Sequence, residues 1–218
     1  IILREPQRVH AIAAAVRAAV PKRVPVTVKT RLGYEDESLF LDIVRAVDTA
    51  GVNELTVHAR TKNHGYRPPA YWEEIARARE VSSINVIANG EIWNPADALR
   101  CLQVTGCKDL MLGRGVLCRP DLPRQVAALN KTQAPESLHW EQIPPLLLHF
   151  FELNLANYDA RYAPNPVKQW LAYLRAYFPQ AALLFESIKR LRDPQELHAR
   201  LRAEVERVQF DIKMTATA

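Results

Sequence analysis

Residues with polar or charged side chains occur near the ends of four short apolar segments in the first half of the chain. The segment VTVKTRLG contains Lys29, ELTVHAR contains His58, INVIANGE contains Asn89, and DLMLGRG contains Gly113 and Arg114. Lysine and arginine can neutralise an anion, and glycine lets the backbone approach one closely. If the fold gathers these residues in one pocket, they are suited to bind a ligand that carries a phosphate.

The four apolar segments are typical of β-strands that alternate with helices. The predicted strands cover residues 24–33, 54–60, 84–91 and 109–115, and the predicted helices cover residues 6–19, 37–50, 71–80 and 95–106. An alternation of strand and helix every roughly 25 to 30 residues indicates βα units and a parallel sheet. The first part of the chain is therefore predicted to be an α/β fold.

The polar residues inside these strands distinguish between two kinds of parallel sheet. Side chains alternate along a strand, so Val26 and Val28 share one face while Lys29 and Arg31 share the other. An open sheet with helices on both faces would bury Lys29 and His58 against apolar helices. A (β/α)8 TIM barrel instead opens the inward strand ends onto its active-site mouth. Four units make half of such a barrel, so we expect its C-terminal half, with the other strands supplied by a preceding segment or another chain.

The turn after the third predicted strand and the end of the fourth are candidates for a phosphate site. In barrel enzymes a phosphate commonly lies between the loops that follow the last two strands. Asn89-Gly90-Glu91 and Gly113-Arg114 would both lie there. Each signal has a plainer explanation when taken alone, because Asn-Gly is most often a turn and a strand-end lysine usually reaches solvent or a partner.

The motifs together resemble one known family. VTVKTRLG, LTVHARTKNHGYRP, VIANGEIW and LMLGRGVLCRPDL are similar to the C-terminal half of the flavin-binding barrel of bacterial tRNA-dihydrouridine synthases. NGEIW and the later VKQWLAYLR are most similar to the C subgroup, which acts on uridine 16 in the D-loop of tRNA. The resemblance covers residues 1 to about 192. It implies that the ligand is FMN and that NADPH is the reductant.

The resemblance also implies roles for individual residues. Lys29 and His58 would contact the isoalloxazine and ribityl parts of FMN, and Tyr66 would meet the tRNA near its target base. The residues expected to hold the FMN phosphate are Asn89, Gly90, Glu91, Gly113 and Arg114.

The family reaction reduces uridine at its 5,6 double bond, with hydride passing from the flavin to C6 and a cysteine protonating C5. That cysteine lies in an Asn-x-Gly-Cys-Pro loop, and no such motif occurs in this sequence. We expect Cys101, Cys107 and Cys118 to be structural. The chain, which begins with Ile1, is therefore expected to be a fragment that contains no catalytic residue and is inactive by itself.

Beyond Pro120 the strand pattern ends, and helices are predicted over 140–157, 166–178, 180–191 and 194–208. We expect a half-barrel domain over 1–130 and an all-helical domain over 137–208, joined by a linker at Asn130–Pro135. By the resemblance the second domain binds tRNA, with Lys168, Gln169 and Arg175 as contacts. The plainer alternative for these basic residues is a solvated helix face.

Composition limits the possible functions. The net charge of +5 permits a polyanionic partner such as tRNA. The sequence contains neither a membrane-spanning apolar run nor a signal-peptide pattern, so we expect a cytoplasmic protein without membrane contact. Its three cysteines do not form a metal-binding motif, so we expect no bound metal. We also expect the full-length protein to be a monomer. Two alternatives stay open. A flavin barrel of the dihydroorotate dehydrogenase kind would explain the lysine and the phosphate site, and a non-catalytic tRNA-binding remnant would explain the basic helices and the missing cysteine motif.

Overall fold

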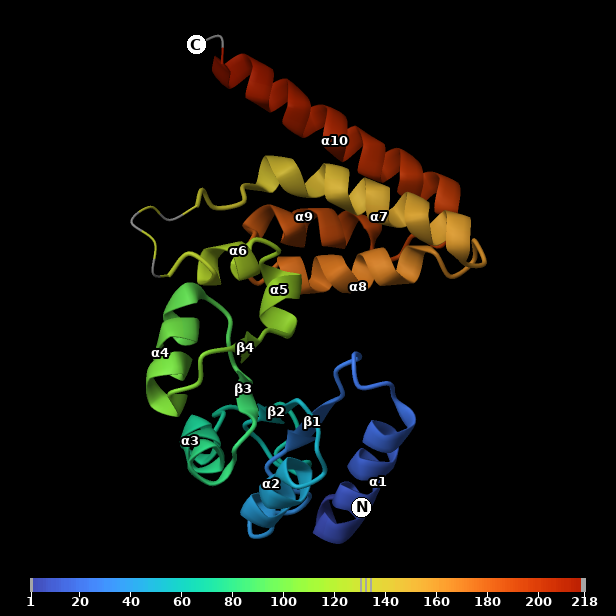
Figure 1. The fold of residues 1–218 in the computed structure, drawn as a ribbon. Helices are drawn as coiled ribbons and strands as arrows, with labels where there is room; N and C mark the ends of the chain where they lie inside the picture. Colours follow the sequence, from blue (N-terminus) through green and yellow to red (C-terminus); the bar gives the residue numbers. More distant parts are fainter. Residues whose placement is uncertain (1, 130, 132, 134, 217–218) are drawn as a thin grey trace. The chain divides into compact units, whose positions relative to one another are not determined.

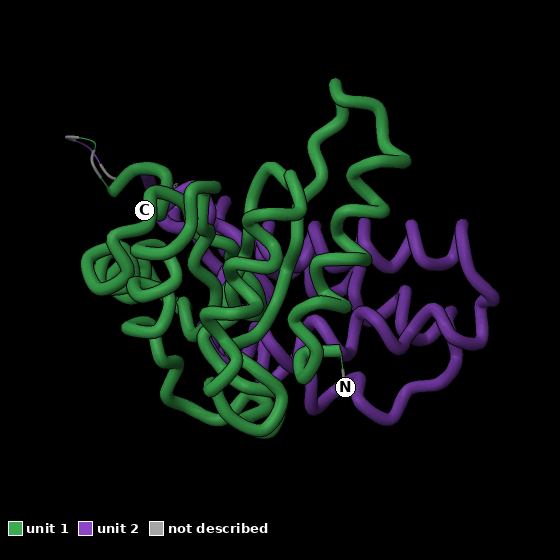
Figure 2. The backbone as a smooth tube through the Cα atoms, turned by 60° about the horizontal axis from the view of Figure 1, so that its bottom comes forward, with its two compact units in different colours: residues 1–115, 126–131 green, residues 116–125, 132–218 purple. Residues whose placement is uncertain are grey.

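The structure is a computed structural model that describes residues 2–129, 131, 133 and 135–216. It divides into two compact units, which Figure 2 shows in different colours: residues 1–115 with 126–131, and residues 116–125 with 132–218. The domain boundary expected at residue 130 lies outside the described residues. Residues 116–125, which were expected in the first domain, belong to the second unit.

The first unit is built on a four-stranded parallel sheet (Figure 1). Its strands are β1 (Thr27–Arg31), β2 (Glu54–His58), β3 (Asn85–Asn89) and β4 (Leu110–Met111), and they lie side by side in chain order. The helices that connect and flank them are α1 (Pro6–Ala19), α2 (Phe40–Asp48), α3 (Trp72–Val81) and α4 (Pro95–Thr105), and a 3-10 turn at Ile2–Arg4 precedes α1.

The sequential strand order explains why one face of the sheet is apolar and the other polar. Right-handed connections between neighbouring strands place every connecting helix on the same face, and α1, α2, α3 and α4 contact one another in that order. The side chains beneath them are fully buried, among them Ile43, Leu55, Val57 and Ile75. This arrangement confirms the predicted α/β class, with consecutive βα units of a barrel followed by helices.

The fourth strand is shorter than predicted. The sequence predicts a strand over 109–115, but only Leu110 and Met111 pair with β3. The ladder stops there because β3 itself ends at Asn89, the partner of Met111. Arg114 instead begins the short helix α5 (Arg114–Cys118). The glycine-arginine motif thus lies at a strand-to-helix turn and not inside a strand.

The second unit is helical among its described residues. After α5 come α6 (Leu122–Val126), a 3-10 turn at Trp140–Gln142, α7 (Ile143–Asn157), α8 (Pro164–Leu174), α9 (Pro179–Ile188) and α10 (Pro194–Ala216). Its core contains Leu147, Phe151, Leu171, Leu184 and Leu201. The helix α8 begins two residues earlier than predicted because proline is well tolerated in the first helical turn. No described helix has both the length and the apolar character needed to cross a membrane.

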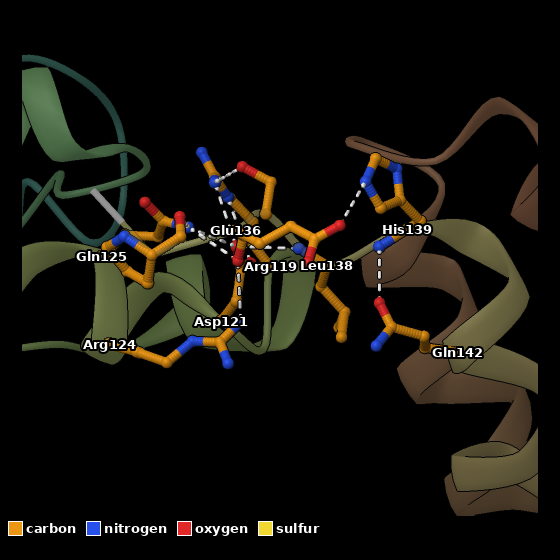
Figure 3. Close-up of polar contacts among 10 residues, drawn as sticks. Arg119, Asp121, Arg124, Gln125, Glu136, Leu138, His139 and Gln142 are labelled. Atoms are coloured by element: carbon orange, nitrogen blue, oxygen red, sulfur yellow. Dashed lines mark hydrogen bonds and ion pairs between the residues drawn. The ribbon is translucent and has the colours of Figure 1, made fainter. Parts of the chain in front are cut away.

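A polar network around Asp121 explains why residues 116–125 fold with the helices (Figure 3). The Asp121 carboxylate accepts hydrogen bonds from the Arg119 guanidinium at 3.1 Å and from the Leu138 backbone N–H at 3.2 Å. Gln125 donates to the Pro135 carbonyl at 2.9 Å, and Arg124 donates to the Glu136 carbonyl at 2.8 Å. These bonds fasten the segment that contains α6 to the chain that enters the 3-10 turn before α7.

Candidate functional site

One row of side chains crosses the sheet at the carboxyl ends of its strands. In the strand register Arg31 lies opposite His58, His58 opposite Asn89, and Asn89 opposite Met111. Partners in a parallel sheet point to the same face, and here it is the face away from the helices. All four residues line one cavity of about 370 Å³.

This cavity gathers the residues that the sequence singled out. Its lining includes every residue predicted to contact the cofactor, namely Lys29, His58, Asn89, Gly90, Glu91, Gly113 and Arg114, and it includes Tyr66. The lining also contains Arg31 and Trp93, to which the sequence reading gave no role in the site. The fold therefore brings these residues together at one cavity, as the strand pattern predicted.

Positive charge dominates the cavity. Lys29, Arg31 and Arg114 line it, and Glu91 is the one acidic side chain in the described lining. Partial burial and then the charge of Arg31 lower the pKa of Lys29. Burial and then the surrounding cations, Arg31 first, lower the pKa of His58 to about 4. His58 is therefore a neutral imidazole at pH 7, and the cavity is suited to an anionic ligand.

The Arg114 guanidinium lies between two aromatic rings, 4.7 Å from the ring centre of Tyr66 and 4.9 Å from that of Trp93. It forms no ion pair with any residue that the structure describes. Cation–π contacts hold the plane of a guanidinium but leave its N–H groups at the edge unused. Next to it, a side chain at Gly113 would meet nothing within 4 Å, so the backbone there is open. Arg114 and Gly113 therefore offer donors and free space to an anion.

The Asn89-Gly90-Glu91 turn requires its glycine. Gly90 has φ +125°, and a Cβ added there would lie 3.0 Å from Cδ2 of His58. The turn is held in place by the Trp72 indole, which donates to the Gly90 carbonyl at 2.9 Å, and by the Asn89 amide, which donates to the Met111 carbonyl at 2.6 Å. Any residue other than glycine would strain the backbone and displace the imidazole.

Glu91 forms an ion pair with Arg60, a residue that the sequence reading did not single out. Arg60 is completely buried and donates to Glu91 and to the carbonyls of Arg67 and Pro69, while its Nη1 lies 3.4 Å from Nε2 of His58. Burial alone would raise the pKa of Glu91, but hydrogen bonds from Arg60 and Trp93 hold that pKa below its usual value. With its carboxylate so engaged, Glu91 can offer an anion only its backbone N–H. Strand alternation does not extend to Arg60, because β2 ends at His58 and the backbone N–H of Arg60 donates to the His58 carbonyl at 2.7 Å.

We expect the low pKa of His58 to be visible by NMR. The Cε1 proton of His58, assigned by its absence in His58→Gln, should titrate with a midpoint of about 4. The pKa of His58 is 6.5 in the unfolded chain, so between pH 6.5 and 4 the unfolded chain binds a proton that the folded protein does not. The free energy of unfolding is therefore unaffected by His58 above pH 6.5 and decreases as the pH falls from 6.5 toward 4. A midpoint at or above 6.5 would contradict the electrostatic environment described here.

The three residues predicted to contact tRNA from the helical domain lie in the second unit. Lys168, on α8, donates to the Leu191 carbonyl, and Gln169 is exposed. Arg175 follows the last residue of α8, where it donates to the Ala172 carbonyl at 3.1 Å and lies 5.1 Å from the ring centre of Phe185. Part of the hydrogen-bonding capacity of Lys168 and Arg175 is thus used within the unit.

The cysteines do not belong to the cavity as the structure describes it. Cys101, Cys107 and Cys118 are buried, and burial raises the pKa of Cys101 to about 12 and also raises that of Cys107. Within the described part of the chain there is no group of three or more histidine, cysteine or acidic side chains that could hold a metal ion.

Comparison with known proteins gives a consistent result. The family model described as "Dihydrouridine synthase (Dus)" matches residues 1–210. Among similar proteins, a tRNA-dihydrouridine(16) synthase of Aquipseudomonas alcaligenes is 44% identical over 90% of this chain and 62% of its own length. Proteins of the same name from Pseudomonas syringae and Shewanella oneidensis are each 45% identical, over 88% and 90% of this chain and 61% of their own lengths. The chain thus spans about three fifths of these relatives.

Proposed function

Because the chain belongs to the dihydrouridine synthase family, we propose that the protein reduces uridine to 5,6-dihydrouridine in tRNA, at position 16 of the D-loop, with FMN as cofactor and NADPH as reductant. The observation that supports this most directly is the cavity at the strand ends, where three cations and a neutral imidazole surround two glycine-containing turns. The names of the relatives support the reaction and the position.

The chemistry of the cavity lining fits FMN. A ribityl phosphate needs charged and backbone donors, and Arg114, the open backbone at Gly113 and the Gly90-Glu91 turn offer them. A flavin ring needs flat apolar walls and a cation near its pyrimidine end, and Lys29 is the candidate for that cation. Trp93 supplies an aromatic wall. A flavin held here would supply the hydride that reduces the uracil ring.

The protein's own residues orient the reactants. Arg60 can only donate hydrogen bonds, so the facing Nε2 of His58 accepts and the proton of the neutral ring is on Nδ1. His58 thereby presents a fixed N–H donor from its other edge. Tyr66 has an exposed fraction of 63% and lies at the cavity, where it can contact a uridine that has left the tRNA stack. We assign the proton at C5 to no residue of this chain.

The helical unit supplies further RNA contacts in this proposal. Lys168, Gln169 and Arg175 lie on or directly after α8, the helix that also carries Trp170. Phosphate contacts from such side chains position an RNA and make its binding depend on salt.

The proposal predicts a defined product. Full-length protein, which carries the segment expected to precede this chain, should add two hydrogen atoms to uridine 16 when it is incubated with FMN, NADPH and unmodified tRNA. Mass spectrometry of nuclease fragments will locate the modified position. A tRNA with cytidine at position 16 is the matched control, and NADH in place of NADPH tests the reductant. Retained tRNA binding without any dihydrouridine would favour the non-catalytic RNA-binding alternative.

A further inference from the structure

A second basic cavity lies in the helical unit, and Lys168 is the one residue of its described lining to which the proposed function gives a role. Its volume is about 340 Å³, and it is formed by three segments: the connection from α7 to α8, the first turns of α8, and the connection from α9 to α10. Three of its lining residues are cations, Arg161, Lys168 and Arg192. No acidic side chain is part of its described lining.

The cations of this cavity are incompletely neutralised. Lys168 donates to the Leu191 carbonyl, and burial followed by the charge of Arg192 lowers its pKa. The guanidinium groups of Arg161 and Arg192 form no ion pair with any described residue. The neighbouring carboxylates of Asp159 and Asp193 accept hydrogen bonds from the backbone N–H groups of Arg161 at 2.8 Å and of Gln195 at 3.0 Å. Three like charges around a small hollow favour the binding of an anion.

An aromatic surface adjoins the cavity. Tyr162 lines both the basic cavity and a neighbouring one of about 610 Å³, whose lining includes Tyr158 and Phe150. The exposed fractions of Tyr158 and Tyr162 are 67% and 56%. The Arg161 guanidinium lies 5.6 Å from the ring centre of Tyr162. A basic hollow beside exposed rings is an arrangement that can bind a single-stranded nucleotide by its backbone and its base face.

Building on the RNA substrate of the proposed function, we propose that the hollow formed by Arg161, Lys168 and Arg192 binds a phosphodiester of single-stranded RNA while a neighbouring base stacks on Tyr162. Non-specific attraction of RNA by surface charge would require neither a cavity nor an adjacent aromatic ring. Stacking on a tyrosine accepts every base, so this site contributes affinity and register and carries little sequence preference.

The test measures binding of the purified protein to a 5′-labelled oligouridylate of about ten nucleotides by fluorescence anisotropy, across a salt series. Arg161→Gln and Arg192→Gln should each weaken binding severalfold and reduce the salt slope by about 0.7, the value for one single-strand phosphate contact. Tyr162→Ala should weaken binding about tenfold. Tyr162→Phe keeps the ring and should bind like the parent protein.

Arg190→Gln is the matched control, because Arg190 is exposed close to Arg192 but does not line the cavity. Equal losses in Arg190→Gln and Arg192→Gln would overturn the proposal in favour of diffuse charge. Competition by uridine monophosphate at the oligonucleotide's own concentration would also overturn it, since the site would then bind free nucleotides. Dihydrouridine formation is measured with the same substitutions in the full-length protein, supplied with FMN, NADPH and tRNA. Product formation with unaltered oligonucleotide binding in the variants refutes this site alone, and selective binding losses without product refute the proposed reaction alone.

Discussion

Replacing Arg114 by alanine is expected to weaken the binding of FMN by about 10- to 100-fold, because losing a charged hydrogen-bond partner costs about 1.5 to 3 kcal/mol. The expectation follows from the position of Arg114 at the cavity, where its guanidinium is held between the rings of Tyr66 and Trp93 and pairs with no described carboxylate. Titration of the purified protein with FMN, followed by quenching of flavin fluorescence, measures the change.

Riboflavin distinguishes a phosphate contact from general damage to the cavity, because it has the same ring system without the phosphate. Arg114→Ala should leave riboflavin affinity nearly unchanged, and Arg114→Lys should give an intermediate FMN affinity, since lysine keeps the charge but loses the planar donor edge. Arg23→Ala removes an exposed arginine outside the cavity and should change neither affinity. Equal losses for FMN and riboflavin in Arg114→Ala would contradict the assigned role.

Replacing Arg60 by methionine is expected to lower the free energy of unfolding by about 3 kcal/mol. Arg60 is fully buried, and the Glu91 side chain has an exposed fraction of 24%. Methionine would fill much of the space but would remove the Arg60 donor from the carbonyls of Arg67 and Pro69. The Glu91 carboxylate would keep only the hydrogen bond from the Trp93 indole and would lose its partner of opposite charge. Urea denaturation followed by circular dichroism gives the change in stability.

An exposed ion pair provides the control for this measurement. Arg45 pairs with Asp42 at 3.1 Å on α2, and the exposed fractions of the two side chains are 55% and 58%. Arg45→Met should therefore cost no more than about 0.5 kcal/mol. Similar costs for Arg60→Met and Arg45→Met would show that the buried pair does not hold the Asn89-Gly90-Glu91 turn in place.

The parts of the fold that depend on local pattern could be predicted from the sequence, and those that depend on distant partners could not. Alternation of apolar and polar residues identified the strands and placed Lys29, His58 and Asn89 on one face. The length of β4 was overestimated because it depends on where β3 ends. The membership of residues 116–125 in the second unit depends on the hydrogen bond from Leu138 to Asp121, between residues that no local pattern connects.

The same distinction applies to the candidate site. The pattern of strand ends identified residues that line the cavity. It did not identify Arg60, which forms the buried ion pair with Glu91 in the turn beside the cavity. Arg60 follows the end of β2, and its partners Glu91, Arg67 and Pro69 come from two different connections. The conformations of those two connections determine which carboxylate pairs with the buried arginine. The residue spacing in HAR contains no information about those conformations.

The register that aligns Arg31, His58, Asn89 and Met111 has an evolutionary consequence. Each βα unit contributes one position to the row, and adding or deleting a single residue within a strand would turn every later side chain of that strand to the opposite face. Point substitutions can therefore accumulate in β1, β2 and β3 one at a time, while changes of length are excluded from them. Insertions and deletions inherited among descendants of this gene should be confined to the connections between the elements.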